Sequence, residues 1–418
     1  MSERSDLRTQ PWGAAALAAG LVSLAVGWWL GWPELAVPGG VATGVFLAGL
    51  AASLGRPGLG VTLAAEHRRV PVGGDPGLTL TLVNTGRRRV WPGNLAVPVR
   101  PQTPRGPAAA GPERLLAIRW PRLAARARPL GRPARSSGLA PGQSLVVCAA
   151  APTKRRGLFL IGPVRAVRGD PFGLVARGFA VGRPLEIAVC PPIATLRFGP
   201  AGMIKDLEGR PTGQAAEPDA SFHALRPYQA GDDVRAIHWR SSARLGRAMV
   251  RQSEDTRRAQ VAAAISTNPA EYGTPEDFEL AVAVCASIGL AALAQAGDVT
   301  IVAGQEVRRF GQPDRGRLLD AAAAMTLDER GGGRLAAAVA RIRGTAPRTT
   351  LAVLVAGAGL TAGELSRAAG LLPRHASVVA VRSGVGGRAT VGRVGRLRLV
   401  GIGELGQLPE LVRRWERV

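Results

Sequence analysis

Cysteine, lysine, tyrosine and histidine are scarce in this chain of 418 residues, which contains three cysteines, two lysines, two tyrosines and four histidines. The cysteines Cys148, Cys190 and Cys285 each lie in an apolar run, and no two of them have the spacing of metal ligands. A small, odd number of cysteines argues against a disulfide framework. It predicts that most of the chain lies in a reducing compartment.

Several motifs of catalytic and nucleotide-binding sites are also missing. The sequence has no G-x-x-x-x-G-K-[ST] phosphate loop, no G-x-S-x-G nucleophile turn and no H-E-x-x-H metal pair. The four histidines, His67, His223, His238 and His375, mostly lie far apart along the chain. We therefore predict that the protein is not an enzyme and has no catalytic residues.

Acidic residues are much fewer than basic ones, since the chain has 30 Asp and Glu residues and 54 Lys and Arg residues, which gives a net charge of +24. Nearly all of the positive charge is arginine, and it is spread along the chain rather than gathered in one stripe with aromatic residues. The composition of a GC-rich genome, together with attraction to an anionic membrane surface, explains this pattern and makes nucleic acid the less favoured partner. A membrane-associated nucleic-acid-binding protein is the alternative, and it requires a contiguous basic face.

Two uncharged runs lie near the N-terminus, from Trp12 to Trp32 and from Leu35 to Leu54. Each run is long enough to cross a bilayer as a helix. A cleaved signal peptide is disfavoured, because a second apolar run follows at once. The flanking arginines are Arg4 and Arg8 before the pair and Arg56, Arg68 and Arg69 after it, and the turn has none. By the positive-inside rule, we expect residues 12–54 to cross the cell membrane twice, with the N-terminus and the C-terminal domains cytoplasmic.

The stretch from Gly60 to about Leu196 contains short β-rich segments bounded by Gly, Pro and Asn. These segments are residues 61–72, 78–86, 144–150 and 184–191. Their spacing predicts an antiparallel, β-sandwich-like domain. Residues 98–143 are rich in Pro, Ala and Arg and have little periodicity, so we expect an extended surface insertion or poorly ordered loops there.

From Arg258 onward, apolar strands alternate with helical segments. We predict strands at 259–266, 299–303, 350–355, 377–381 and 397–400, and helices at 274–296, 316–325, 334–342 and 362–372, with a last helix to Trp415. The first helix has a clear start, since the cap residue Thr274 is followed by Pro275 and two acidic residues. This alternation implies a mostly parallel sheet covered on both faces.

Charged and aromatic side chains are densest between Phe222 and Glu254, which we call the signature stretch. Asp232 is placed to cap a helical turn that ends near Trp239, after which Ser241, Ser242 and Gly246 indicate a loop. Residues 248–252 alternate like a short strand. Paired Asp and Arg side chains here would lock two domains together, or the stretch would form a partner-docking surface. Catalysis is the least favoured interpretation.

The signature stretch resembles a bacterial family known as domain of unknown function 58, whose pattern is roughly R-x-Y-x-x-G-D-D-x-R-x-I-x-W-x-x-[ST]-A-R. The residues that fall on the pattern are Arg226, Tyr228, Gly231, Asp232, Asp233, Arg235, Ile237, Trp239, Ser242, Ala243 and Arg244. Further likeness lies in Arg156-Gly157, in the D-P-F-G-L turn at 170–174, and in a strand end where Cys190 replaces the usual Tyr. The resemblance implies a membrane anchor, a von Willebrand factor A-like domain and a MoxR-type AAA ATPase as partner.

The same resemblance raises the question of a metal site. Domains of the von Willebrand factor A class often bind Mg²⁺ through an Asp-x-Ser-x-Ser motif after the first strand, because a hard cation needs carboxylate and hydroxyl oxygens. Here the corresponding residues are Ile265-Ser266-Thr267-Asn268-Pro269, which lack the carboxylate. We therefore expect no metal and no cofactor at this position.

The sequence thus predicts a multidomain protein. Its parts are a two-helix membrane anchor at 1–58, a β-sandwich-like domain at 59–197, a segment carrying the signature at 198–256, and a von Willebrand factor A-like α/β domain at 257–418. We expect a cytoplasm-facing scaffold or adaptor that works with a MoxR-type AAA ATPase. The residues expected to bind the partner or to hold the structure are Arg226, Tyr228, Asp232, Asp233, Arg235, Trp239, Arg240 and Arg244. No particular client, process or oligomeric state is indicated.

Overall fold

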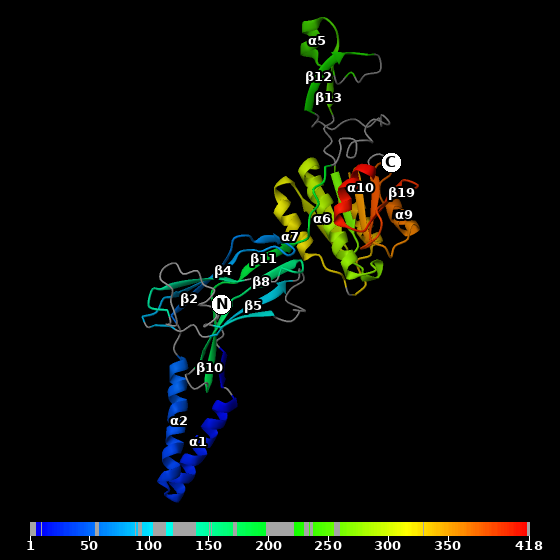
Figure 1. The fold of residues 1–418 in the computed structure, drawn as a ribbon. Coiled ribbons are helices and arrows are strands. Elements are labelled where there is room, and N and C mark those ends of the chain that lie inside the picture. Colours follow the sequence, from blue (N-terminus) through cyan, green and yellow to red (C-terminus); the bar gives the residue numbers. More distant parts are fainter. Residues whose placement is uncertain are drawn as a thin grey trace. The chain divides into compact units, whose positions relative to one another are not determined.

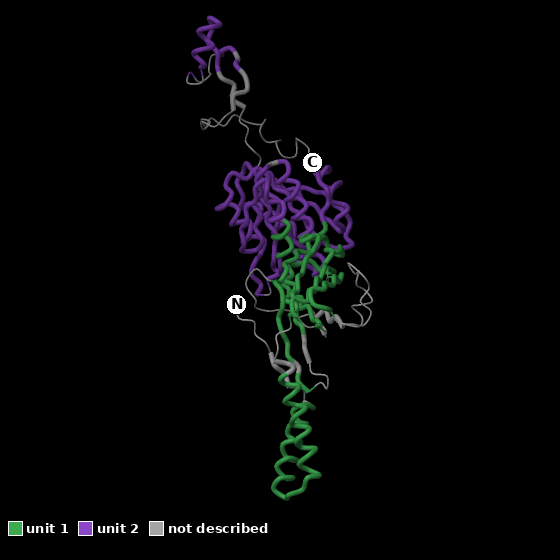
Figure 2. The backbone as a smooth tube through the Cα atoms, turned by 90° about the vertical axis from the view of Figure 1, so that its left-hand side faces the viewer, with its two compact units in different colours: residues 1–192, 319–324 green, residues 193–318, 325–418 purple. Residues whose placement is uncertain are grey.

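The chain folds into two compact units, which the computed structural model places at residues 1–192 with 319–324, and at 193–318 with 325–418 (Figure 2). The structure describes residues 6–9, 11–54, 58–87, 89–90, 94–102, 114–119, 139–149, 151, 153–169, 174–197, 221–229, 234, 237–254, 260–328 and 330–415.

Unit 1 contains a helical hairpin made of α1 (Pro11–Leu30) and α2 (Pro33–Leu54) (Figure 1). Small residues let the two backbones approach, since a Cβ added at Gly39 would lie 2.5 Å from the backbone nitrogen of Leu24. The outward side chains are apolar, and at the turn Trp28 and Trp29 are more than four-fifths exposed. Both helices are long and apolar enough to cross a membrane, which agrees with the predicted apolar runs.

A third helix of comparable length and apolarity, α6 (Pro275–Ala296), lies in unit 2. Its apolar window is 83% buried inside the protein, whereas those of α1 and α2 are only 17% buried. The apolar side chains of α6 therefore pack inside unit 2, whereas most of those of α1 and α2 are exposed on the surface.

Apart from residues 319–324, which belong to the helix Arg315–Ala324, the remaining elements described in unit 1 are strands, and most of their pairings are antiparallel. The strands are β1 (Asp6–Thr9), β2 (Leu59–Ala65), β3 (Arg69–Pro71), β4 (Leu78–Asn84), β5 (Asn94–Gln102), β6 (Arg114–Arg119), β7 (Ser144–Ala149), β8 (Gly157–Ile161), β9 (Val164–Gly169), β10 (Val175–Val181) and β11 (Leu185–Cys190). One sheet has the order β2-β4-β7, and the other has the order β1-β10-β9-β5-β8-β11-β3 with β6 beside β5. Among these described pairings, β11 with β3 is parallel.

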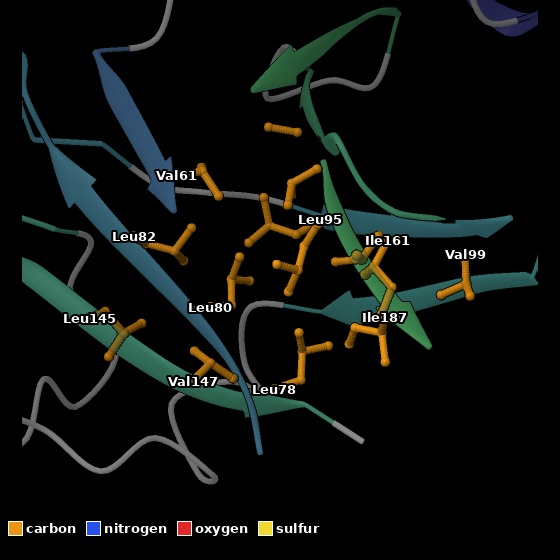
Figure 3. Packing of buried hydrophobic residues seen from close by; sticks show 14 of the residues in the cluster. Val61, Leu78, Leu80, Leu82, Leu95, Val99, Leu145, Val147, Ile161 and Ile187 are labelled. Carbon is orange, nitrogen blue, oxygen red and sulfur yellow. The ribbon is translucent and has the colours of Figure 1, made fainter. Parts of the chain in front are cut away.

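The two sheets share one hydrophobic core (Figure 3). Alternate residues of β4, namely Leu78, Leu80 and Leu82, are buried, as the period of two in a strand requires. They belong to the same cluster as Leu95 of β5 and Ile187 of β11. The predicted antiparallel β domain is confirmed at this level.

The expectation for residues 98–143 was wrong in part. Residues 94–102 form β5, which pairs with β6, β8 and β9, and Val99 is only 3% exposed. Leu139 is also buried, and it bridges to Val90. Pro98 and Pro101 made the strand hard to recognise, because proline cannot donate to a ladder. The pairing of β5 with three other strands overrides this local preference.

The strand β1 was not predicted. It pairs antiparallel with β10, from Asp6 opposite Gly178 to Thr9 opposite Val175. The chain therefore contributes one strand to the sheets of unit 1 before the helical hairpin and the remaining strands after it.

Unit 2 contains a seven-stranded mixed sheet in the order β16-β15-β14-β17-β18-β20-β19. Its strands are β14 (Gln260–Ile265), β15 (Asp298–Ala303), β16 (Glu306–Phe310), β17 (Leu351–Gly357), β18 (Ser377–Ser383), β19 (Thr390–Val394) and β20 (Leu397–Ile402). The five inner strands are parallel, as predicted, and the edge strands β16 and β19 are antiparallel additions that the sequence pattern did not reveal.

Helices accompany this sheet at the predicted places. They are α6, α7 (Arg315–Ala324), α8 (Leu335–Thr345), α9 (Ala362–Gly370) and α10 (Leu408–Trp415). The α8 and α9 side chains share one buried cluster with Ala262 and Ala264 of β14 and Leu354 of β17. The predicted start of α6 is confirmed, since Thr274 and Asp277 form a reciprocal capping box.

Candidate functional site

The signature stretch forms a hairpin with a short helix at its end (Figure 1). The strand β12 (Ser221–Pro227) pairs antiparallel with β13 (Met249–Glu254), and α5 (Trp239–Leu245) lies between them in sequence. We call residues 221–254 the signature hairpin. The predicted strand at 248–252 is confirmed as β13.

Hydrogen bonds tie α5 to β13. The ring nitrogen Nδ1 of His238 accepts from the backbone N–H of Ser241 at 3.2 Å and so caps the helix, while the backbone N–H of His238 donates to the carbonyl of Met249 at 2.8 Å. The Ser242 hydroxyl donates to the His238 carbonyl at 3.1 Å and accepts from the Met249 N–H at 2.8 Å. The two bonds to Met249 fix the helix against the strand, and the other two hold its first turn.

One boundary predicted in this stretch was wrong. Ser241 and Ser242, expected in a loop, lie within α5, which begins at Trp239. The Nδ1 atom of His238 caps α5, and Gly246, with φ of +63°, ends it. The turn predicted from Asp232 to near Trp239, with Asp232 as its cap, lies mostly outside the described residues.

The surface of α5 combines aromatic, aliphatic and cationic side chains. Within this helix, all of which the structure describes, no residue is buried, and Trp239 is 70% exposed. Arg240 and Arg244 are exposed and stand one helical turn apart, and Leu245 is 55% exposed. Under the helix, Met249 and Val250 of β13 are buried, so the hairpin has a small apolar anchor of its own.

The remaining predicted site residues are placed only in part. Tyr228 is 38% exposed, and its backbone N–H donates to the carbonyl of Ala248 at 2.9 Å. Arg226 pairs with Val250 in the backbone register of the hairpin. Asp232, Asp233 and Arg235 lie outside the described residues, so the predicted Asp-Arg network stays a prediction. His238 and Ser242, which hold α5 in place, were not among the residues predicted to bind the partner or to hold the structure.

A second candidate region is the carboxyl edge of the unit 2 sheet. Strand order reverses between β14 and β17, and in open α/β sheets ligands bind outside the carboxyl ends of the strands at such a point. In this chain Ser266, Thr267 and Asn268 follow β14, and all three are buried. The Ser266 hydroxyl accepts from the N–H of Asn268 at 3.1 Å, and Asn268 Oδ1 accepts from the N–H of Ala270 at 3.0 Å.

The loop that follows β14 packs over this edge. The carboxylate of Glu271 accepts from the N–H of Leu335 at the start of α8, at 3.2 Å, and the Tyr272 hydroxyl donates to the Ser266 carbonyl at 2.8 Å. A Cβ at Gly357, the last residue of β17, would lie 2.6 Å from Tyr272 Cα. The polar groups at this edge therefore form hydrogen bonds that hold the loop against the sheet.

The described residues contain no group of three His, Cys, Asp or Glu side chains placed to hold a metal ion. The oxygen atoms of Ser266 and Asn268 are already engaged with backbone N–H groups. Hard cations are held by several oxygen ligands that include carboxylates. The donors at this edge do not fit an Mg²⁺ site.

Comparison with known proteins identifies the part of the chain that contains both candidate regions. Residues 224–407 match the family model described as "Protein of unknown function DUF58". This part of the chain belongs to DUF58. The DUF58 region begins inside β12, includes α5 and the whole seven-stranded sheet, and ends just before α10. The helical hairpin and the β-rich part of unit 1 lie outside it.

Other comparisons add little to this assignment. No curated protein matches the chain. Among solved structures, a Paenibacillus sp. cycloisomaltooligosaccharide glucanotransferase complexed with cycloisomaltoheptaose is similar at 12% sequence identity, with a TM-score of 0.18. The likeness covers 77% of this chain and 53% of that chain, and at such a TM-score it carries no argument.

Proposed function

We propose that this protein is a membrane-anchored scaffold or adaptor that faces the cytoplasm and docks a partner protein through its signature hairpin, with no catalysis of its own. The observation that carries the proposal is the exposed Trp239, Arg240 and Arg244 surface on a helix held rigidly by His238 and Ser242. Tryptophan and arginine are the residue types that most often dominate the binding energy of protein interfaces.

The membrane part of the proposal rests on α1 and α2. Their apolar, exposed side chains suit a lipid environment, and strands of unit 1 lie on both sides of them in sequence. Since β1 and β10 are hydrogen-bonded neighbours, the two ends of the hairpin belong on one side of the bilayer. The arginines at both outer ends, and their absence from the turn, favour the cytoplasm as that side.

The expected partner follows from the family resemblance and from the charge of the surface. Members of DUF58 are associated with MoxR-type AAA ATPases, and two exposed arginines one turn apart suit an acidic patch on such a partner. We also propose that the α/β part of the DUF58 region is von Willebrand factor A-like. Support comes from the parallel inner strands and from the reversal of strand order between β14 and β17.

Co-purification of the MoxR-type AAA ATPase from detergent-solubilised membranes tests this function. We expect a double variant, Arg240→Ala with Arg244→Ala, to melt like the wild type and to lose about thirtyfold or more of its ATPase affinity, because a hot-spot residue contributes about 2 kcal/mol or more. The matched control, Arg343→Ala with Arg413→Ala, removes two exposed helical arginines elsewhere in unit 2 and should bind normally.

Two outcomes would count against the proposal. If the Arg240 and Arg244 double variant folds normally and retains the ATPase fully, the docking surface is wrong. If nuclease treatment before capture releases the ATPase, the interaction runs through nucleic acid, and the alternative of a membrane-associated nucleic-acid-binding protein takes its place.

A further inference from the structure

The strand β19 lies at one edge of the unit 2 sheet (Figure 1). Among the described strands it pairs with β20 alone, and no described backbone group outside β20 bonds to it. Four of its five residues are exposed, whereas at the other edge four of the five residues of β16 are half-buried or buried. Within the described part of the chain, the outer N–H and C=O groups of β19 are therefore open to another chain.

Both ends of β19 are anchored, so its open edge is preformed. Before the strand, the N–H of Val385 donates to the carboxylate of Asp277 at 2.7 Å. After the strand, the guanidinium of Arg396 in the turn to β20 donates to carbonyls at and just beyond the end of α9. These carbonyls belong to Ala369, Leu372 and Pro373. A partner that binds this edge therefore loses little free energy in ordering it.

The chain around β19 is rich in arginine and has no acidic residue. Between Leu365 and Gly403 there are seven arginines and no Asp or Glu. Arg393 of β19 is directly opposite Arg398 of β20, so the two side chains lie on the same face of the sheet. The residues before and after Arg398 pack with the cluster of α8 and α9 on the other face. The β19 edge thus presents two neighbouring arginines on the face that is opposite to α9.

The charge of these two arginines is not balanced within the described residues. Arg393 Nε donates to the carbonyl of Gly395 at 2.9 Å, and no ion pair in the described part of the chain includes Arg393 or Arg398. At the other edge, by contrast, Arg308 pairs with Glu306 of the same strand at 2.9 Å. Like charges directly opposite each other destabilise a sheet. Carboxylates supplied by a partner would remove this repulsion and form charge-assisted hydrogen bonds with the two guanidinium groups.

We propose that β19 docks an extended, acidic segment of a partner protein, which adds a strand to the unit 2 sheet and places carboxylates beside Arg393 and Arg398. Side chains alternate along an added strand, so acidic residues at every second position fall on the face of the two arginines. A second copy of this chain fits poorly, because pairing through its own β19 brings arginine rather than acid to the edge. This docking site goes beyond the proposed function and does not depend on the signature hairpin.

Hydrogen exchange of the full chain in phosphatidylcholine nanodiscs, with and without a synthetic peptide, tests the site. The probe is a peptide of about eight residues in which glutamate alternates with threonine. At a peptide concentration of about ten times its Kd, we expect the amides of Thr390–Val394 to exchange roughly tenfold more slowly, because binding protects them by mass action. High salt should weaken the binding, and so should a peptide of the same composition whose glutamates are gathered at one end.

Variants test the role of the two arginines. Arg393→Gln with Arg398→Gln should weaken peptide binding by roughly fivefold or more, because each cross-strand charge pair changes affinity by roughly 1.5- to 5-fold. Arg393→Lys with Arg398→Lys should keep most of the affinity. The matched control is Arg334→Gln with Arg343→Gln, which removes two exposed arginines at the start of α8 and within it. It should bind the peptide like the wild type.

Several results would overturn the proposal. The first is a wild-type protein that does not bind the peptide, or that binds it with no slowing of exchange in β19. The second is a glutamine variant of Arg393 and Arg398 that binds the peptide as tightly as the wild type does. Protection of β19 that rises with protein concentration in the absence of peptide would assign the edge to a second copy. Displacement of the peptide by a lower concentration of single-stranded DNA would assign it to nucleic acid.

Discussion

Replacement of Gly357 by alanine tests how closely the loop after β14 packs against the carboxyl edge of the unit 2 sheet. The new methyl group would lie 2.6 Å from Tyr272 Cα and would also overlap the carbonyl of Glu271. Both neighbours are backbone atoms, so a side-chain rotation cannot relieve the contact. The loop after β14 has to move away from β17.

The cost of that movement follows from the contacts that hold the loop. Overpacking of a close-packed core costs about 1–3 kcal/mol. Moving the loop also loosens the Tyr272 hydroxyl bond to the Ser266 carbonyl, worth about 1 kcal/mol, and the Glu271 carboxylate bond to the Leu335 N–H, worth about 2 kcal/mol. We expect Gly357→Ala to lower the stability of unit 2 by about 4–6 kcal/mol.

Hydrogen exchange of peptides from β14 and β17 provides the assay, because it reports the stability of unit 2 separately from that of unit 1. The matched control is Gly363→Ala in α9, an exposed helical glycine whose added methyl group would meet no described atom within 4 Å. The control should gain about 0.5–1 kcal/mol, since alanine favours helix more than glycine does. If the β14 and β17 peptides exchange as slowly in the Gly357→Ala variant as in the Gly363→Ala control, the loop after β14 does not pack against Gly357 as described.

Two further predictions concern titratable groups. At pH 7.5 a maleimide should label the exposed Cys148 and leave two thiols unreacted, because burial raises the pKa of Cys190 to about 11 and that of Cys285 to about 12; labelling of all three in the native protein would contradict this. Hydrogen bonds from Thr361 lower the pKa of Glu364, and the N–H of Gly311 together with Arg317 lowers that of Asp314. The stabilisation that these two carboxylates contribute is complete above their unfolded-state pKa values of about 4.3 and 3.9, and it is lost as the pH falls through their lower folded-state pKa values. The double variant Glu364→Gln with Asp314→Asn should therefore show a smaller fall in melting temperature with decreasing pH. An unchanged slope of melting temperature against pH would refute this.

Local signals in the sequence were enough for the helices of unit 2 and for its inner strands. The start of α6 was predicted from three nearby residues, Thr274, Pro275 and Asp277, and the capping box confirms the prediction. The apolar runs of α1 and α2 were equally local. The edge strands β16 and β19 were missed because EVRRF and TVGRV lack apolar alternation, and each is defined by its pairing with a neighbour.

The parts that escaped prediction depend on contacts between distant segments or on unusual local chemistry. β5 contains two prolines and becomes a strand through β6, β8 and β9. In the signature hairpin, α5 extends over Ser241 and Ser242 because His238 caps it and because His238 and Ser242 bond to Met249 of β13. The exposure of Trp239 is likewise a property of the folded hairpin, since the sequence alone allows tryptophan to be either a core residue or an interface residue.

The pairing of β1 with β10 also determines when the first strand can join its sheet during synthesis. About 170 residues separate Asp6 from Gly178, so at 5–20 residues per second the ribosome needs roughly ten to thirty seconds to produce the partner of the first strand. By then α1 and α2, if they span the membrane, have already left the ribosome and can have entered the bilayer. The N-terminal strand thus has no partner until residues 175–178 have been made, and during that time it is open to pairing with another chain.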